Sequence, residues 1–127
     1  MRTKDSTSVS IRLRFSLQAR IGPGKIALLE GVARTGSIAA AGRELGMSYR
    51  RAWLLIDSLS GIFAEPVIVT AAGGSHGGGS QLTALGEQLV AAFRAAERDA
   101  QRAVAKHFSE LLPRIQLDDE GPAGPDA

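Results

Sequence analysis

A chain of 127 residues that is 44% hydrophobic has the size of one globular domain with its own core. It has no cysteine and only two histidines, which excludes a disulfide framework, thiolate metal sites and cysteine nucleophiles. It also shows no apolar run of membrane-spanning length and no signal peptide, so we expect a cytoplasmic protein that does not associate with a membrane.

The charges are distributed unevenly along the chain. Residues 1–60 contain ten basic and four acidic side chains, whereas residues 61–127 contain five basic and nine acidic ones. The basic first half indicates a polyanionic partner, although an ordinary solvated surface would give the same count.

The first element after a flexible N-terminus, residues 1–7, is predicted at Ser8–Gln18. Apolar and polar residues alternate strictly there, which is typical of a half-buried strand. Pro23 then suits the first turn of a helix that ends near Arg34, before Gly36.

Two short helices separated by the turn Gly46–Ser48 follow. Ser37 and Ser48 are predicted to cap them, and the small residues at 40–42 permit close helix packing. The second helix has four apolar residues on one face, at Ala52, Leu55, Ile56 and Leu59. This pattern predicts a helix-turn-helix whose second helix reads DNA.

The outward face of the second helix is predicted to contact DNA. Arginine side chains bind guanine edges or phosphates, hydroxyl groups donate to phosphate or base, and a helix N-terminus favours an anion. The alternative for the two arginines is that they lie on an ordinary solvated face. For Trp53, partial burial beside the first helix is as compatible with the sequence as a contact with DNA. From the two helices, the residues predicted to bind DNA are Ser37, Ser48, Tyr49, Arg50, Arg51 and Trp53.

A glycine-rich loop lies between two short apolar segments, "VIVTAAGG" and "SQLT". Gly73, Gly78 and Ser80 match the spacing of a phosphate-binding loop, but Gly79 stands where that loop requires lysine. Strand, loop and strand after a helix-turn-helix instead predict a wing, whose glycines let the backbone approach a phosphate chain. The predicted DNA contacts of its tip are Gly74, Ser75, His76, Gly77 and Gly78, with a loop that makes no contacts as the alternative.

The residues 83–112 are predicted to form one long amphipathic helix capped by Thr83. Its apolar stripe is expected to pack against a second copy rather than only within the chain. The expected dimerisation residues are Leu89, Phe93, Ala96, Ala100, Ala103, Val104, Phe108 and Leu111. The acidic tail, 113–127, is expected to be disordered, so its carboxylates offer no fixed metal site.

Two blocks, "GSIAAAGRELGMSYRRAW" and "GGSHGGGSQLT", make the chain resemble the N-terminal DNA-binding domain of the molybdate-dependent transcriptional regulators, the ModE family. That domain is similar to the winged helix-turn-helix of LysR-type regulators. The resemblance implies a mainly α fold with a small β component: a winged helix-turn-helix at 8–82, followed by a long C-terminal dimerisation helix. It also implies a homodimer that binds palindromic double-stranded DNA operators and controls molybdate transport or molybdoenzyme genes.

The chain departs from the family pattern after the long helix. Family members continue into a pair of small β-barrel domains that bind molybdate, whereas no strand pattern follows residue 112 here. We therefore expect no molybdate-binding domains and no cofactor. A winged helix that binds a protein instead of DNA is the alternative function, disfavoured by the basic "SYRR". An enzyme is disfavoured by the missing lysine and by the lack of a nucleophile with a nearby base.

Overall fold

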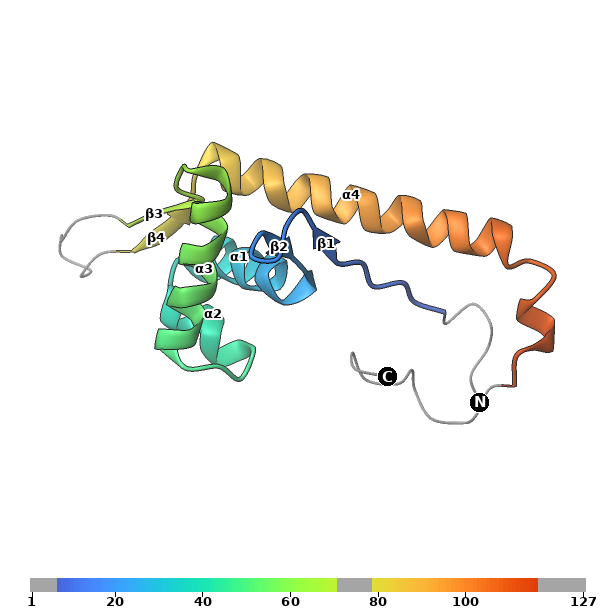
Figure 1. Cartoon of the computed structure of the whole chain (residues 1–127). Coiled ribbons are helices and arrows are strands. Elements are labelled where there is room, and N and C mark those ends of the chain that lie inside the picture. Colours follow the sequence, from blue (N-terminus) through green and yellow to red (C-terminus); the bar gives the residue numbers. More distant parts are fainter. Residues whose placement is uncertain (1–6, 71–78, 117–127) are drawn as a thin grey trace. The chain divides into compact units, whose positions relative to one another are not determined.

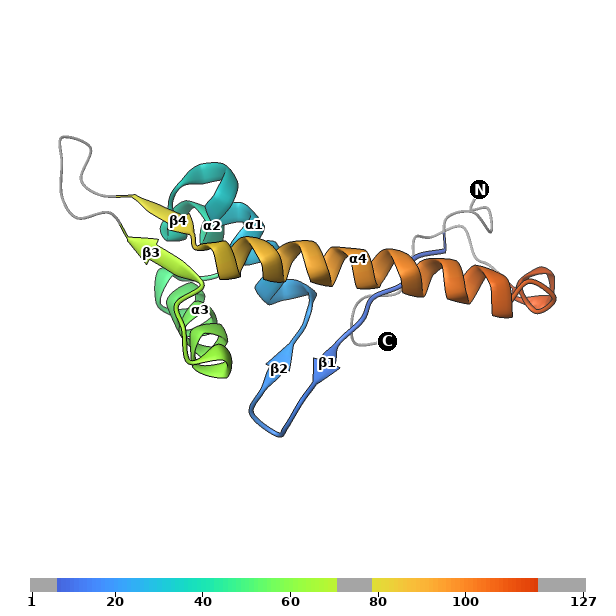
Figure 2. The same cartoon turned by 90° about the horizontal axis from the view of Figure 1, so that it is seen from above.

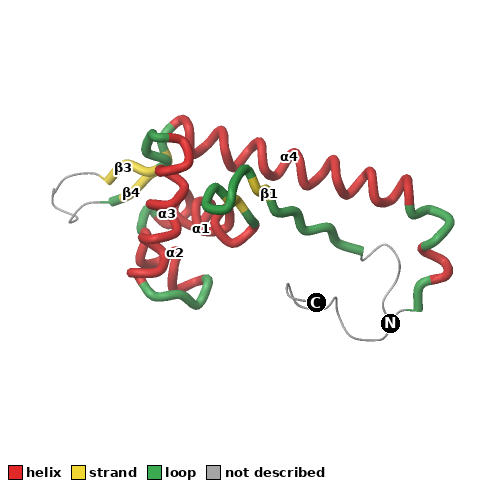
Figure 3. The backbone as a smooth tube through the Cα atoms, in the orientation of Figure 1, coloured by secondary structure: helices red, strands yellow, loops and turns green. Residues whose placement is uncertain are grey.

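The computed structural model describes residues 7–70 and 79–116, which form four helices and two small antiparallel sheets (Figures 1 and 3). The mainly α class with a small β component is confirmed. The elements are β1 (Leu13–Arg14), β2 (Arg20–Ile21), α1 (Pro23–Thr35), α2 (Ile38–Glu44), α3 (Tyr49–Phe63), β3 (Ile68–Thr70), β4 (Ser80–Leu82), α4 (Ala84–His107) and a 3-10 turn, η2 (Leu112–Arg114). The chain divides into two units, 12–94 and 1–11 with 95–127, which we describe separately.

The helix boundaries in the first unit follow from local capping. Gly36 adopts a left-handed conformation with φ of 72° and ends α1, as predicted. Ser37 Oγ accepts a hydrogen bond from the amide of Ala40 at 3.0 Å, and Ser48 Oγ accepts one from the amide of Arg51 at 3.1 Å. Both predicted N-caps are therefore confirmed.

Small residues let the first three helices pack closely. A Cβ atom added to Gly31 would lie 2.9 Å from Ala41 Cβ, and one added to Gly42 would lie 3.2 Å from Ala52 Cβ. The crossing of α2 with α1 and α3 therefore requires the small residues that the sequence places there. The side chains beneath this crossing include the fully buried Ile26, Leu28, Leu29, Val32 and Leu59.

The predicted strand at 8–18 is wrong in its extent. Burial alternates up to residue 14, but the chain then turns and returns as β2, which pairs Leu13 with Ile21. Ser16 Oγ accepts hydrogen bonds from the amides of Gln18 and Ala19 and so closes the turn. Phe15 and Leu17, expected on the buried face, are therefore exposed at the tip of the β1–β2 hairpin.

The strands β3 and β4 form the antiparallel ribbon expected for a wing, with Val69 opposite Gln81 (Figure 2). Its base is attached to the turn between α1 and α2 by one hydrogen bond, and a second hydrogen bond extends the ribbon itself. The amide of Ser80 donates to Gly36 O at 2.8 Å, in the turn between α1 and α2, and the amide of Thr83 donates to Val67 O at 3.0 Å. The predicted tip residues, 74–78, lie outside the described residues.

The long helix α4 begins as predicted, because Thr83 Oγ1 accepts a hydrogen bond from the amide of Gly86 at 3.1 Å. It ends at His107 rather than at 112. Residues 108–111 form turns, and η2 then begins at Leu112, followed by Pro113, which has no amide hydrogen. Phe108 and Leu111, two of the expected dimerisation residues, therefore follow the helix.

The first part of α4 belongs to the core of the first unit. Leu89 and Phe93 are only 9% and 2% exposed, so the chain itself covers these two members of the expected dimer stripe. Arg94 binds Glu30 of α1 through two hydrogen bonds, of 3.0 and 2.7 Å. This bidentate pair ties the first half of α4 to α1.

The second unit contains the rest of α4. Its helix side chains are mostly exposed, and Gln101 Nε2 donates to Thr7 O at 2.7 Å, which holds the chain N-terminal to β1 on the helix. Arg102 forms an ion pair with Asp99 on the same helix. Across residues 7–70 and 79–116, no helix has the length and apolarity needed to span a membrane.

Candidate nucleic-acid interface

The amino-terminal turn of α3 presents the residues that the sequence predicts to bind DNA. Ser48 caps it, and Tyr49, Arg50 and Arg51 follow with exposed side chains. Within the described residues, the guanidinium groups of both arginines have no hydrogen-bond or ion-pair partner. Their charges are therefore available to an anion at the end of the helix that already favours one.

Other arginines of the same unit are neutralised by acidic neighbours. Arg34 forms an ion pair with Glu44, and Arg94 forms one with Glu30. Arg43, in the last turn of α2, is exposed and has no such partner in the described part of the chain. Sequence reasoning did not select Arg43, although its position just before the turn between α2 and α3 was the available signal.

The helical periodicity of α3 separates the roles of its two arginines. Counting about 100° per residue, Arg50 lies opposite the buried positions Ala52, Ile56 and Leu59, whereas Arg51 lies at the side of the helix. Arg50 therefore points directly away from the core. Arg51 points toward one flank of any groove that receives the helix.

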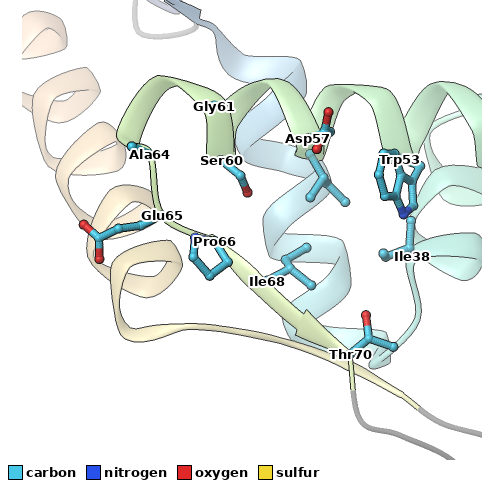
Figure 4. Close-up of a pocket in the computed structure, with 11 residues that line it drawn as sticks. Ile38, Trp53, Asp57, Ser60, Gly61, Ala64, Glu65, Pro66, Ile68 and Thr70 are labelled. Atoms are coloured by element: carbon cyan, nitrogen blue, oxygen red, sulfur yellow. The ribbon is translucent and has the colours of Figure 1, made fainter.

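Trp53 forms one wall of an open groove between α3 and β3 (Figure 4). The groove has a volume of about 530 Å³, and Ile38, Pro66 and Ile68 contribute apolar surface to it. The indole is 47% exposed. Trp53 thus combines partial packing in the groove with an accessible face.

The charged residues that line this groove are both acidic. Asp57 lies one helical turn beyond Trp53, and Glu65 follows the end of α3. Carboxylates repel a phosphate backbone, so the groove marks a limit of the surface that DNA could occupy. Contacts with DNA are therefore expected at the amino end of α3 and not at its carboxyl end.

The first unit as a whole is basic, with nine Lys or Arg residues against five acidic ones between positions 12 and 94. The Arg94 hydrogen bond lowers the pKa of Glu30, which keeps that carboxylate charged and paired. Burial lowers the pKa of Lys25, and the nearby Arg20 adds to the shift; Lys25 Nζ donates to Arg20 O at 2.7 Å. Neither perturbed group lies on α3, so both belong to the supporting structure.

Comparison with known proteins agrees with the resemblance carried by the two sequence blocks. No protein-family model matches the chain. It is 44% identical over 100 residues to the molybdenum-pterin-binding protein MopB of Rhodobacter capsulatus, a match that covers 79% of this chain and 36% of the relative. It is 39% identical over 113 residues to the molybdenum transport protein ModE of Azotobacter vinelandii, covering 86% and 42% respectively.

The name of a third relative describes it as a transcriptional regulator. The chain is 34% identical over 109 residues to the transcriptional regulator ModE of Yersinia pestis, which covers 84% of this chain and 41% of the relative. The matches thus span about two fifths of the length of these relatives. Most of this chain is accordingly similar to one part of the ModE and Mop proteins.

Proposed function

We propose that this chain is a dimeric, sequence-specific DNA-binding regulator of transcription of the ModE type. The observation that carries the proposal is the pair of unpartnered, exposed arginines on the first turn of α3, which follows α2 after a short turn and precedes the β3–β4 ribbon. Relatives named as DNA-binding or transcriptional regulators support it. The regulated genes would be those for molybdate transport or molybdoenzymes, and the protein would act in the cytoplasm.

In this proposal the amino end of α3 enters the major groove. Arg50 reads a base edge because it points away from the core, and Arg51 binds the phosphates beside the groove. Ser37 and Ser48 keep their hydroxyl hydrogens free to donate to phosphate, since each oxygen already accepts an amide hydrogen bond. The wing follows the neighbouring backbone. None of these contacts requires a metal or cofactor.

Dimerisation would place two such units on a palindromic operator. The remaining part of the apolar stripe, beyond Phe93, is available for it: Ala96 and Ala103 are exposed, and Ala100 and Val104 are partly exposed. Small side chains on a helix allow a second helix to approach closely. A twofold symmetric protein would read two half-sites related by the same symmetry.

The experiment compares DNA binding by the wild type, Arg50→Ala and Arg51→Ala, with Arg98→Ala on the distal part of α4 as the matched control. Fluorescence anisotropy with the upstream DNA of the gene, and with single-base variants of it, is measured at several salt concentrations. We expect a slope of log affinity against log salt of roughly −5 to −7 for the wild type, from six to eight phosphate contacts.

The two arginine variants should then differ. Arg50→Ala should cost about 1–3 kcal/mol at one operator position and abolish the base preference there. Arg51→Ala should weaken binding to all sequences and reduce the salt slope by about one unit. Equal, sequence-independent losses would contradict these roles. A wild-type protein that binds no DNA at low salt would instead favour the second candidate, a winged helix that binds another protein.

A further inference from the structure

The large apolar side chains exposed in the described residues fall into two groups. Leu45, Tyr49, Trp53, Leu54 and Val69 belong to the helix-turn-helix and the wing. The second group comprises Phe15 and Leu17 on the β1–β2 hairpin and Phe108, Leu111 and Ile115 after α4. The proposed DNA contacts account for part of the first group and leave the hairpin unexplained.

The hairpin tip has a defined hydrogen-bonded structure. The amide of Phe15 donates to Ala19 O at 2.8 Å, and Ser16 Oγ accepts the amides of Gln18 and Ala19 at 3.3 and 3.0 Å. This turn holds Phe15 and Leu17 in solvent, with 67% and 85% of their surfaces exposed. A two-stranded hairpin with uncovered apolar residues is marginally stable in water, so the tip indicates a contact with another molecule.

The size of the tip limits what can cover it. Its two apolar side chains expose on the order of 300 Å² per copy, well below the roughly 800 Å² per partner of a standard interface. The tip is therefore part of a larger interface. In a twofold symmetric dimer each contact occurs twice, so the same tip counts twice toward the buried area.

The chain leading into the hairpin is bound to the helix proposed to dimerise. Thr7 O accepts the hydrogen bond from Gln101 on the distal part of α4, and β1 begins six residues later at Leu13. We infer that the β1–β2 hairpin is a dimerisation arm, whose Phe15 and Leu17 pack on the second copy of this chain. This inference rests on the dimeric form proposed above and adds an interface element to it.

The charge of the arm disfavours a contact between the two tips. Arg12, Arg14 and Arg20 surround Phe15 and Leu17, and no acidic residue lies between Asp5 and Glu30 in the sequence. Two tips facing each other would bring six cationic side chains together. We therefore place each arm on another surface of the second copy.

The test measures the dimer dissociation constant by analytical ultracentrifugation for the wild type, Leu17→Ser and the double variant Phe15→Ser, Leu17→Ser. Leu54→Ser, on the exposed side of α3, is the matched control because its residue is 51% exposed. Circular dichroism checks that each variant folds. We expect the dissociation constant to rise about 30-fold or more for the double variant, since each lost contact counts twice, and to remain unchanged for Leu54→Ser.

A second measurement locates the arm directly. The chain has no cysteine, so Leu17→Cys carries a single thiol to which a benzophenone maleimide photo-crosslinker can be attached. Irradiation should give a covalent dimer at concentrations where the protein is dimeric. Crosslinks formed only within one chain would overturn the inference.

The outcomes separate this inference from the proposed function. A wild-type protein that stays monomeric refutes the dimeric form itself. A wild-type dimer whose dissociation constant is unchanged by both tip substitutions refutes only the arm. Unchanged dimerisation with DNA binding that is weaker even at saturating dimer concentration would show that DNA covers the tip, which also overturns the inference.

Discussion

Replacing Gly86 by alanine should destabilise the chain, although alanine is the better helix former. Gly86 lies in the first turn of α4 where the helix crosses the segment before β3. A Cβ atom there would lie 2.3 Å from Val67 O and 3.3 Å from Leu82 Cβ. Ordinary contacts between carbon and carbonyl oxygen begin near about 3.3 Å, so the two backbone segments must separate by roughly 1 Å.

The loss in the free energy of unfolding follows from the hydrogen bonds that this separation strains. Val67 O accepts the amide of Thr83, and Thr83 Oγ1 caps Gly86. Overpacking costs about 1–3 kcal/mol, and a weakened cap adds up to about 1 kcal/mol. The gain in helix propensity offsets at most about 1 kcal/mol. We expect a net loss of about 1–3 kcal/mol in the free energy of unfolding.

The matched control is Gly61→Ala in α3, where an added Cβ meets nothing within 4 Å. The same chemical change should there stabilise the chain by about 0.5–1 kcal/mol. Urea unfolding followed by circular dichroism measures both effects, and Gly86→Ala should lower the midpoint by roughly 1 M. An unchanged or raised midpoint for Gly86→Ala, or an equal loss for Gly61→Ala, would refute the steric argument.

Four further substitutions, at three positions, test one helix cap and the charges. Ser48→Ala should cost about 1 kcal/mol of stability, whereas Ser48→Asp should keep the cap but weaken DNA binding about tenfold or more in an anisotropy titration, because a carboxylate then faces phosphate. Asp57→Asn should raise the affinity for all DNA sequences several-fold at low salt, and an unchanged affinity would place the groove away from DNA. Because Arg94 lowers the pKa of Glu30 below its ordinary 4.5, the pair stabilises the folded chain above that pH and loses its effect as the pH falls through the lowered pKa. Glu30→Gln should therefore flatten the decline in urea midpoint between about pH 6 and about pH 3, and an unaltered decline would contradict this role.

The parts of the fold that depend on local hydrogen bonds could be predicted from the sequence. The caps at Ser37, Ser48 and Thr83 bind amides three residues ahead, so a short stretch of sequence contains all the relevant atoms. The β1–β2 hairpin could not be predicted in this way. Strict alternation predicts a strand up to Gln18, and only the hydroxyl of Ser16 and the pairing of Leu13 with Ile21 decide that the chain turns back.

The residues of the candidate site show the same difference between local and tertiary information. The arginines on the first turn of α3 could be selected because helical periodicity alone places them away from the buried face. Periodicity does not say which neighbour covers an apolar stripe, so Leu89 and Phe93 were assigned to a second copy although the chain itself buries them. The acidic groove could not be predicted from periodicity. It forms because Asp57 of α3 and Glu65 line the same groove as β3, and only the tertiary structure brings these elements together.

The hydrogen bond from Ser80 to Gly36 makes the base of the wing and the amino end of α2 one mechanical piece. If α3 and the wing contact DNA as proposed above, the separation between their two contacts is then set by the fold of the protein. Because a backbone contact carries no sequence information, one base pair inserted between those two positions should leave the wing contact in place and change only the bases presented to α3. The energetic penalty of such an insertion should therefore equal that of the base changes it introduces beneath α3.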